Sequence, residues 1–163
     1  MDGRPPYGSY AAITGVFAGG LALAGGLARA LGRNPACQTT LDLVVLSAAT
    51  FKAARTIARD EVTSFLRAPF VKGEAHSGDE EEPVEGGTAQ AIGELVTCSR
   101  CAGAWAAAGL ASTQIIAPRF GRLLTWSFAA AGINDFLQAA FAALSEKADE
   151  PETSADARMR ALG

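Results

Sequence analysis

The chain has 163 residues, enough for one domain, and a net charge of −3. Hydrophobic residues make up 49% of it and charged residues only 19%, whereas about 25% charged residues is usual in soluble domains. The charges form short clusters between long uncharged stretches, which favours a small polytopic membrane protein in contact with a lipid bilayer. The net negative charge comes from an acidic run and an acidic tail, so nucleic acid is not an expected partner.

Four apolar stretches predict membrane helices. The first, 10–31, holds 22 residues, of which only Arg29 is charged, and about 20 apolar residues cross a hydrocarbon core. The second, 41–58, carries Asp42, Lys52 and Arg55, so a helix lying in the membrane plane is the alternative there. The third and fourth, 97–117 and 123–144, are joined by a short segment that begins at Pro118, which predicts an antiparallel hairpin.

The segments between and after these stretches are more polar. Asp60–Phe70 repeats apolar residues at helical spacing and contains Pro69 near its end, which predicts a short helix at the membrane interface. Residues 73–87 offer almost no apolar side chain to bury, so we expect an acidic disordered linker. We expect a membrane domain over 1–147 and a polar tail over 148–163.

Basic residues set the expected orientation. With both termini in the cytoplasm, ten Lys and Arg side chains lie inside and four outside, as the positive-inside rule prefers. This topology places Cys98 and Cys101 at the cytoplasmic face and Cys37 outside. The predicted fold is therefore an all-α integral membrane bundle with about four transmembrane helices and a short interfacial helix.

Three ordered motifs carry a family resemblance: FKAARTIARDEVTSFLRAPF at 51–70, ELVTCSRCAGAW at 94–105 and GINDFLQ at 132–138. Together they resemble the domain of unknown function 1360 family of small bacterial membrane proteins, over roughly 41–144. The family pattern falls on Asp60, Thr63, Leu66, Arg67, Pro69, Phe70, Cys98, Cys101, Gly103, Trp105, Asp135, Phe136 and Leu137. The resemblance implies a multi-pass protein of the bacterial inner membrane and no established activity.

The Cys98-x-x-Cys101 pair leaves three readings open. A helix start and the nearby Arg100 favour a reactive thiolate, hence a thiol-redox site. Structural zinc prefers four ligands, and within one chain only Cys37 and His76 could complete the set, from distant segments. An intersubunit site with four cysteines is the remaining zinc alternative; otherwise we expect no cofactor. The third reading is that both cysteines pack as small apolar side chains.

Asp135 is an ionisable residue inside a predicted span, where a charge needs a partner. At about 1.5 Å rise per residue, Asp135 and Lys52 lie at similar depths, and Arg55 lies one turn further along. We therefore expect an ion pair between Asp135 and Lys52 or Arg55 that fixes the register of two helices. The functional alternative is a proton or solute relay at Asp135.

No phosphate-binding loop, HExxH motif or pair of catalytic carboxylates occurs in the sequence. We therefore expect a non-enzymatic structural or interaction role, with a homo-oligomer or another membrane protein as partner. The first alternative is a thiol-redox or metal-binding protein acting through Cys98 and Cys101. The second is a small-solute or proton transporter that uses Asp135.

Overall fold

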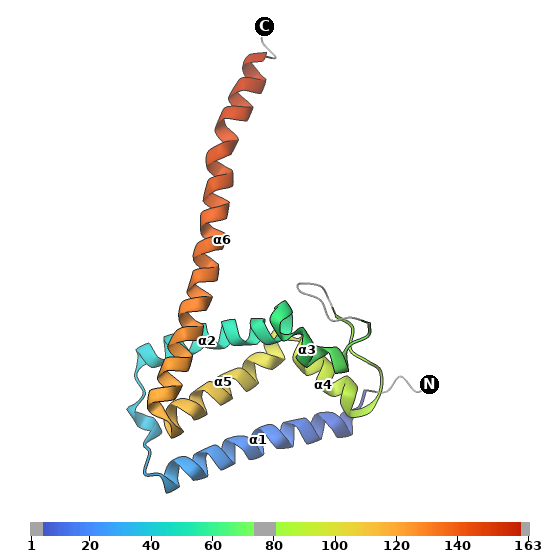
Figure 1. The fold of residues 1–163 in the computed structure, drawn as a ribbon, viewed down its shortest axis with the longest axis vertical. Helices are drawn as coiled ribbons and strands as arrows, with labels where there is room; N and C mark the ends of the chain where they lie inside the picture. Colours follow the sequence, from blue (N-terminus) through green and yellow to red (C-terminus); the bar gives the residue numbers. More distant parts are fainter. Residues whose placement is uncertain (1–4, 74–80, 161–163) are drawn as a thin grey trace.

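The computed structural model describes residues 5–73 and 81–160, without the side chains of Cys37 and residues 148–160. These residues form an all-α fold (Figure 1). The α-helices are α1 (Tyr7–Ala30), α2 (Thr40–Arg59), α3 (Ser64–Arg67), α4 (Gly87–Thr97), α5 (Ser99–Ile116) and α6 (Pro118–Arg160), with short 3-10 turns at Pro35–Cys37, Glu61–Thr63 and Ala68–Phe70. Helix α5 lies between α1 and α2, and α6 projects far beyond the other helices.

Local sequence signals explain where the helices begin and end. Helix α1 ends at Ala30, and Gly32 just beyond it has a φ of 64° that lets the Arg33 amide donate to the Ala28 carbonyl at 2.8 Å, in the geometry of a Schellman cap. Helix α2 begins with a capping box, in which the side chains of Thr39 and Asp42 each bind the other's backbone amide.

Two close approaches of α6 to its neighbours have glycine at the contact. In the hairpin between α5 and α6, a Cβ atom at Gly121 would lie 2.5 Å from the backbone of Gln114. Where α6 crosses α2, a Cβ atom at Gly132 would lie 3.2 Å from both the Ala48 carbonyl oxygen and the Lys52 Cβ. The predicted antiparallel hairpin is present, and its tightness depends on Gly121.

The core lies where α2, α5 and α6 meet, and it is built mainly from alanine. Its buried members are Ala49, Ala53, Leu110 and Ala129. Large apolar side chains point outward instead, among them Leu23 (77% exposed) and Phe141 (74% exposed). Small side chains let the helix axes approach closely, while the larger ones remain available to the surroundings.

The prediction of four membrane spans is wrong. Within the part of the chain that the structure describes, α1 is the one helix long and apolar enough to cross a membrane. Helix α2 is interrupted by Lys52 and Arg55, and α5 is rich in alanine and glycine and carries Arg100 and Gln114. These residues lower the hydrophobicity of segments that are otherwise long enough. A multi-pass topology is therefore not supported.

Two other expected segments look different in the structure. Residues 74–80 of the expected acidic linker lie outside the described residues, but Glu81 and the residues after it make specific contacts. The backbone amide of Lys72 donates to the Glu82 carbonyl at 2.8 Å, and that of Val84 donates to the Phe70 carbonyl at 3.0 Å. The backbone of the expected polar tail continues α6 as far as Arg160.

Candidate functional site

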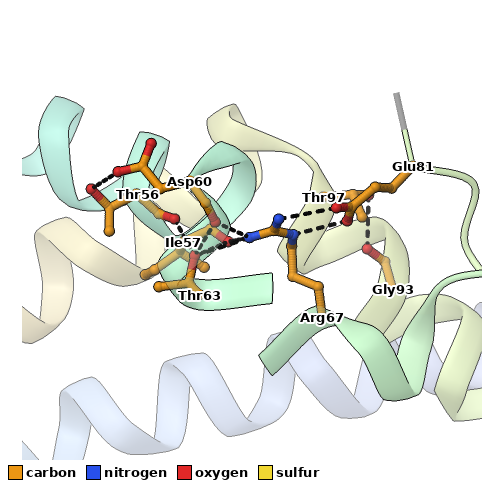
Figure 2. A network of polar contacts seen from close by, with 8 residues as sticks. All are labelled: Thr56, Ile57, Asp60, Thr63, Arg67, Glu81, Gly93 and Thr97. Carbon is orange, nitrogen blue, oxygen red and sulfur yellow. Dashed lines mark hydrogen bonds and ion pairs between the residues drawn. The ribbon is translucent and has the colours of Figure 1, made fainter. Parts of the chain in front are cut away.

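Arg67 is the centre of a buried polar network at the end of α2 (Figure 2). Its side chain is 0% exposed, and that of its partner Glu81 is 6% exposed. The guanidinium binds the carboxylate with two bonds, Nε to Oε2 at 2.8 Å and Nη2 to Oε1 at 3.0 Å. Its Nη1 donates to the Ile57 carbonyl at 2.9 Å and to the Asp60 carbonyl at 3.1 Å.

Asp60 and Thr63 belong to the same network. Asp60 follows the last residue of α2, and its Oδ2 accepts a hydrogen bond from the Thr56 hydroxyl at 2.8 Å. The Thr63 hydroxyl donates to the Thr56 carbonyl and accepts from Arg67 Nη1 at 2.9 Å. The motif that includes Asp60, Thr63 and Arg67 therefore closes the end of α2 onto α3. We call this network, together with Glu81, the Arg67 clasp.

Sequence reasoning missed Glu81, because it stands in a run of acidic residues that looked like a solvated linker. The available signal was Arg67 itself. An arginine between apolar residues at helical spacing needs a carboxylate when it is buried. The sequence could not show which acidic residue of the run supplies that carboxylate.

The other family-motif residues contribute to packing. Pro69 lies in the 3-10 turn Ala68–Phe70 that follows α3. Gly103 faces α2, where a Cβ atom would sit 3.8 Å from the Ala54 Cβ. Trp105 meets Phe17 of α1 edge to face, with ring centroids 5.1 Å apart. Gly103 and Trp105 therefore hold α5 against its neighbours on both sides.

Cys98 and Cys101 lie at the start of α5. Cys98 occupies the break between α4 and α5 and is partly buried, and Cys101 is exposed. The Cys98 sulfur accepts a hydrogen bond from the Cys101 backbone amide at 3.4 Å and so caps α5. A hydrogen bond from the Cys101 thiol, followed by that backbone amide, lowers the pKa of Cys98, and the same thiol contact raises the pKa of Cys101 to about 11.

A cavity of about 490 Å³ opens beside Cys98. It lies between the end of α2, the junction of α4 with α5, and the segment that carries Glu81. Its walls are formed by Ala58, Arg59, Glu81, Thr97, Cys98, Ser99 and Arg100. The cavity therefore brings together a thiol, two arginines and one member of the Arg67 clasp.

The described residues contain no group of three or more His, Cys, Asp or Glu side chains that could hold a metal ion. His76 and the Cys37 side chain lie outside the described part. The zinc site shared between two chains stays a prediction, since it requires a second copy.

The structure brings Lys52 and Asp135 together across α2 and α6. Lys52 Nζ donates to Asp135 Oδ2 at 2.9 Å and lies 3.6 Å from Asp60 Oδ2. Phe51 and Phe136 stack beside the pair with centroids 5.2 Å apart. Arg55, the alternative partner, forms no ion pair with any residue among 5–73 and 81–147. The Asp135 hydrogen bond raises the pKa of Lys52 above its ordinary 10.5.

The fold and site define a small all-α protein with one apolar N-terminal helix, a buried arginine clasp and a dithiol next to a cavity. Residues 45–141 match the family described as "Protein of unknown function (DUF1360)". This match covers more than half of the chain, so the protein belongs to the DUF1360 family. Helix α1 lies outside the matched residues.

One curated relative is similar over much of its length. The chain is 30% identical over 109 residues to "Sporulation protein YjcA" of Bacillus subtilis (strain 168), which covers 60% of this chain and 88% of that protein. That protein's name connects it with sporulation. No solved structure matches the chain.

The Arg67 clasp predicts a large difference between neighbouring glutamates. Glu81→Gln removes the carboxylate from a buried guanidinium and should lower the free energy of unfolding by about 3–5 kcal/mol. The control is Glu82→Gln, because the Glu82 side chain is 79% exposed and lies 3.6 Å from Lys72; its loss should be about 0–1 kcal/mol. Chemical denaturation in detergent measures both, and equal losses would contradict the clasp.

The pair Lys52–Asp135 predicts coupling between two helices. Asp135→Asn and Lys52→Met should be non-additive by about 1 kcal/mol in a double-mutant cycle, a modest value because the Asp135 side chain is 40% exposed. The raised pKa of Lys52 makes this contribution full at neutral pH, and it is lost only as the pH rises through that pKa. The matched cycle with Arg55→Met should be additive within about 0.5 kcal/mol; coupling to Arg55 instead would show that the pairing is wrong.

Proposed function

We propose that this protein has a structural or interaction role at a membrane, to which α1 anchors it. The observation that carries the proposal is the character of α1. It has 24 residues, and Ala28 is its one buried residue. At about 1.5 Å per residue it is about 36 Å long, enough to cross a hydrocarbon core of about 30 Å.

Contacts between α1 and the rest of the chain support this role. Near its start the Tyr10 hydroxyl donates to Glu94 Oε2 at 2.5 Å, and Ser9 lies close to Thr88. Further along, Phe17 meets Trp105. The rest of α1, which includes Leu21, Leu23 and Leu27, leaves its apolar side chains exposed. An exposed apolar surface of this size in water is unfavourable, and a lipid environment removes the cost.

Lipid is also the partner that best fits the other helices' exposed surface. Alanine fills the core, while Leu43, Val44 and Phe51 on α2 and Leu123 and Leu137 on α6 are exposed. Buried small residues and exposed large apolar ones are typical of helices packed next to lipid. We infer that these side chains contact the bilayer in which α1 is anchored.

A single crossing by α1 puts the two ends of that helix on opposite sides of the membrane. Arg29 and Arg33 follow the apolar part of α1, and Arg4 precedes it. The positive-inside rule therefore favours a cytoplasmic position for the turn that follows α1 and contains Cys37. The contacts of Tyr10 with Glu94 and of Phe17 with Trp105 keep α4 and α5 beside α1.

The ion pair of Asp135 with Lys52 supports a structural role for these charges. A relay residue needs a changing partner, whereas the Asp135 carboxylate is hydrogen-bonded to Lys52 on the neighbouring helix. The pair fixes the register of α2 against α6, and Lys52 and Asp135 both lie within the residues that match the family.

Charges placed within α1 test the anchor. Val16 and Leu23 are 66% and 77% exposed, and a lysine at the centre of a span costs about 2.5–3.5 kcal/mol. Val16→Lys together with Leu23→Lys should move the tagged full chain out of the carbonate-resistant membrane fraction. The control Leu31→Lys lies just beyond α1 and should leave the chain in that fraction.

Two results would contradict the anchor. In the first, the double variant stays in the membrane fraction as fully as Leu31→Lys. In the second, N-terminal sequencing of the mature chain begins after Ala30, which would show that α1 is a cleaved signal sequence.

A further inference from the structure

The two cysteines at the start of α5 are in unequal environments. Cys98 lies at the break between α4 and α5, where its sulfur accepts the Cys101 backbone amide at 3.4 Å. The unpaired amides at the first turn of a helix carry partial positive charge, which stabilises a thiolate. Cys101 is exposed one turn further on, on the same helix. The Cys98 sulfur therefore caps the start of α5, and the Cys101 thiol lies in contact with the Cys98 sulfur.

The titration of the two thiols follows this geometry. The hydrogen bond from the Cys101 thiol, then the Cys101 amide and Arg100, lower the pKa of Cys98. The contact with Cys98 raises the pKa of Cys101 to about 11. When the pair loses its first proton, the remaining proton therefore stays on Cys101, and the negative charge is on Cys98. Such a division assigns attack to Cys98 and the second, resolving step to Cys101.

The cavity beside Cys98 gives a substrate access to the sulfur. Its volume of about 490 Å³ falls within the usual range of about 300–1,000 Å³ for small-molecule sites. Arg100 lines it together with Cys98. Arginine binds carboxylates with strong, charge-assisted hydrogen bonds. The cavity is therefore suited to a small disulfide that carries carboxylate groups near its sulfur atoms.

We propose that Cys98 and Cys101 form a thiol–disulfide exchange site whose substrate is a small, carboxylate-bearing disulfide. The Cys98 thiolate attacks one substrate sulfur, forms a mixed disulfide and releases the other half of the substrate as a thiolate. Cys101 then loses its proton and attacks the Cys98 sulfur, which releases the second half as a thiolate. The substrate disulfide gains two electrons, and the two cysteines lose two as they become a disulfide. A dithiol reductant reverses the change.

Trapping the mixed disulfide tests this site. All variants carry Cys37→Ser, so that the pair is the only source of thiols. In detergent, the Cys101→Ser chain treated with glutathione disulfide should accumulate glutathione on Cys98, seen by mass spectrometry. The chain with both cysteines should instead yield the Cys98–Cys101 disulfide and two equivalents of glutathione. The Cys98→Ser chain should react at least about tenfold more slowly, because Cys101 lies one turn inside α5 and lacks the contact with the first-turn amide that stabilises the Cys98 thiolate.

Two comparisons separate the roles of geometry and charge. Cys101→Ala removes the thiol hydrogen bond and should raise the midpoint of the pH profile for alkylation of Cys98 by iodoacetamide.

Replacement of glutathione disulfide by the uncharged hydroxyethyl disulfide should slow mixed-disulfide formation. Arg100→Gln should reduce the difference in rate between the two disulfides. Equal rates for both probes in the parent chain would overturn the carboxylate-bearing substrate.

Other outcomes would overturn the exchange site itself. One is alkylation of Cys98 and Cys101 at equal rates with the same pH profile in the parent chain. Another is that the thiols of the purified protein react only after a chelator removes zinc, and that one zinc is present for each pair of chains. This result would assign the cysteines to a metal site between two copies. Each readout is independent of membrane association, so failure of the anchor leaves the exchange site standing, and the reverse also holds.

Discussion

The buried ion pair between Arg67 and Glu81 is the interaction on which the arrangement around the cavity depends. A guanidinium with no exposure is tolerated only when its N–H groups find acceptors. Here the acceptors are the Glu81 carboxylate, the Thr63 hydroxyl and the carbonyls of Ile57 and Asp60. Those carbonyls lie in the last turn of α2 or just past it, where no further helical turn follows to supply amides. One side chain therefore satisfies the end of α2, holds α3 in place and draws the segment at Glu81 against the start of α5.

Helix packing elsewhere relies on small residues rather than on large buried ones. Gly121 permits an approach that a Cβ atom would block, and Gly132 permits one that a Cβ atom would crowd. Ala49, Ala53 and Ala129 fill the space between α2, α5 and α6. Each alanine buries little apolar area, so the hydrophobic contribution of this core is small for a chain of this length. More of the stability must therefore come from other interactions than in a soluble domain. These are the Lys52–Asp135 pair, the Arg67 clasp and the contacts of exposed leucine and phenylalanine side chains with their environment.

The sequence predicted features that depend on neighbouring residues, such as turns and helix starts, and the pairing of a charge that needs a partner. The depth argument placed Lys52 and Asp135 near each other, and the structure joins them at 2.9 Å. The helical hairpin at Pro118 and the position of the dithiol at a helix start also follow from local residues. The number of membrane spans could not be predicted from the length of the apolar stretches alone. Charged and small residues in α2 and α5 lower the hydrophobicity of these helices below that of a span. Glu81 could not be identified either, since its neighbours in the acidic run have the same charge and burial is set by tertiary contacts.

The clasp also has an electrostatic consequence for the dithiol. Glu81 lines the same cavity as Cys98, and an unpaired carboxylate there would oppose a thiolate by like-charge repulsion. Arg67 binds both carboxylate oxygens of Glu81, so the cavity wall carries a neutralised pair instead of a free negative charge. With that repulsion removed, the hydrogen bond from Cys101 and the positive charge of Arg100 act on Cys98 without opposition from Glu81. The residues that fasten α2 to α3 thereby set the charge around Cys98 at the start of α5.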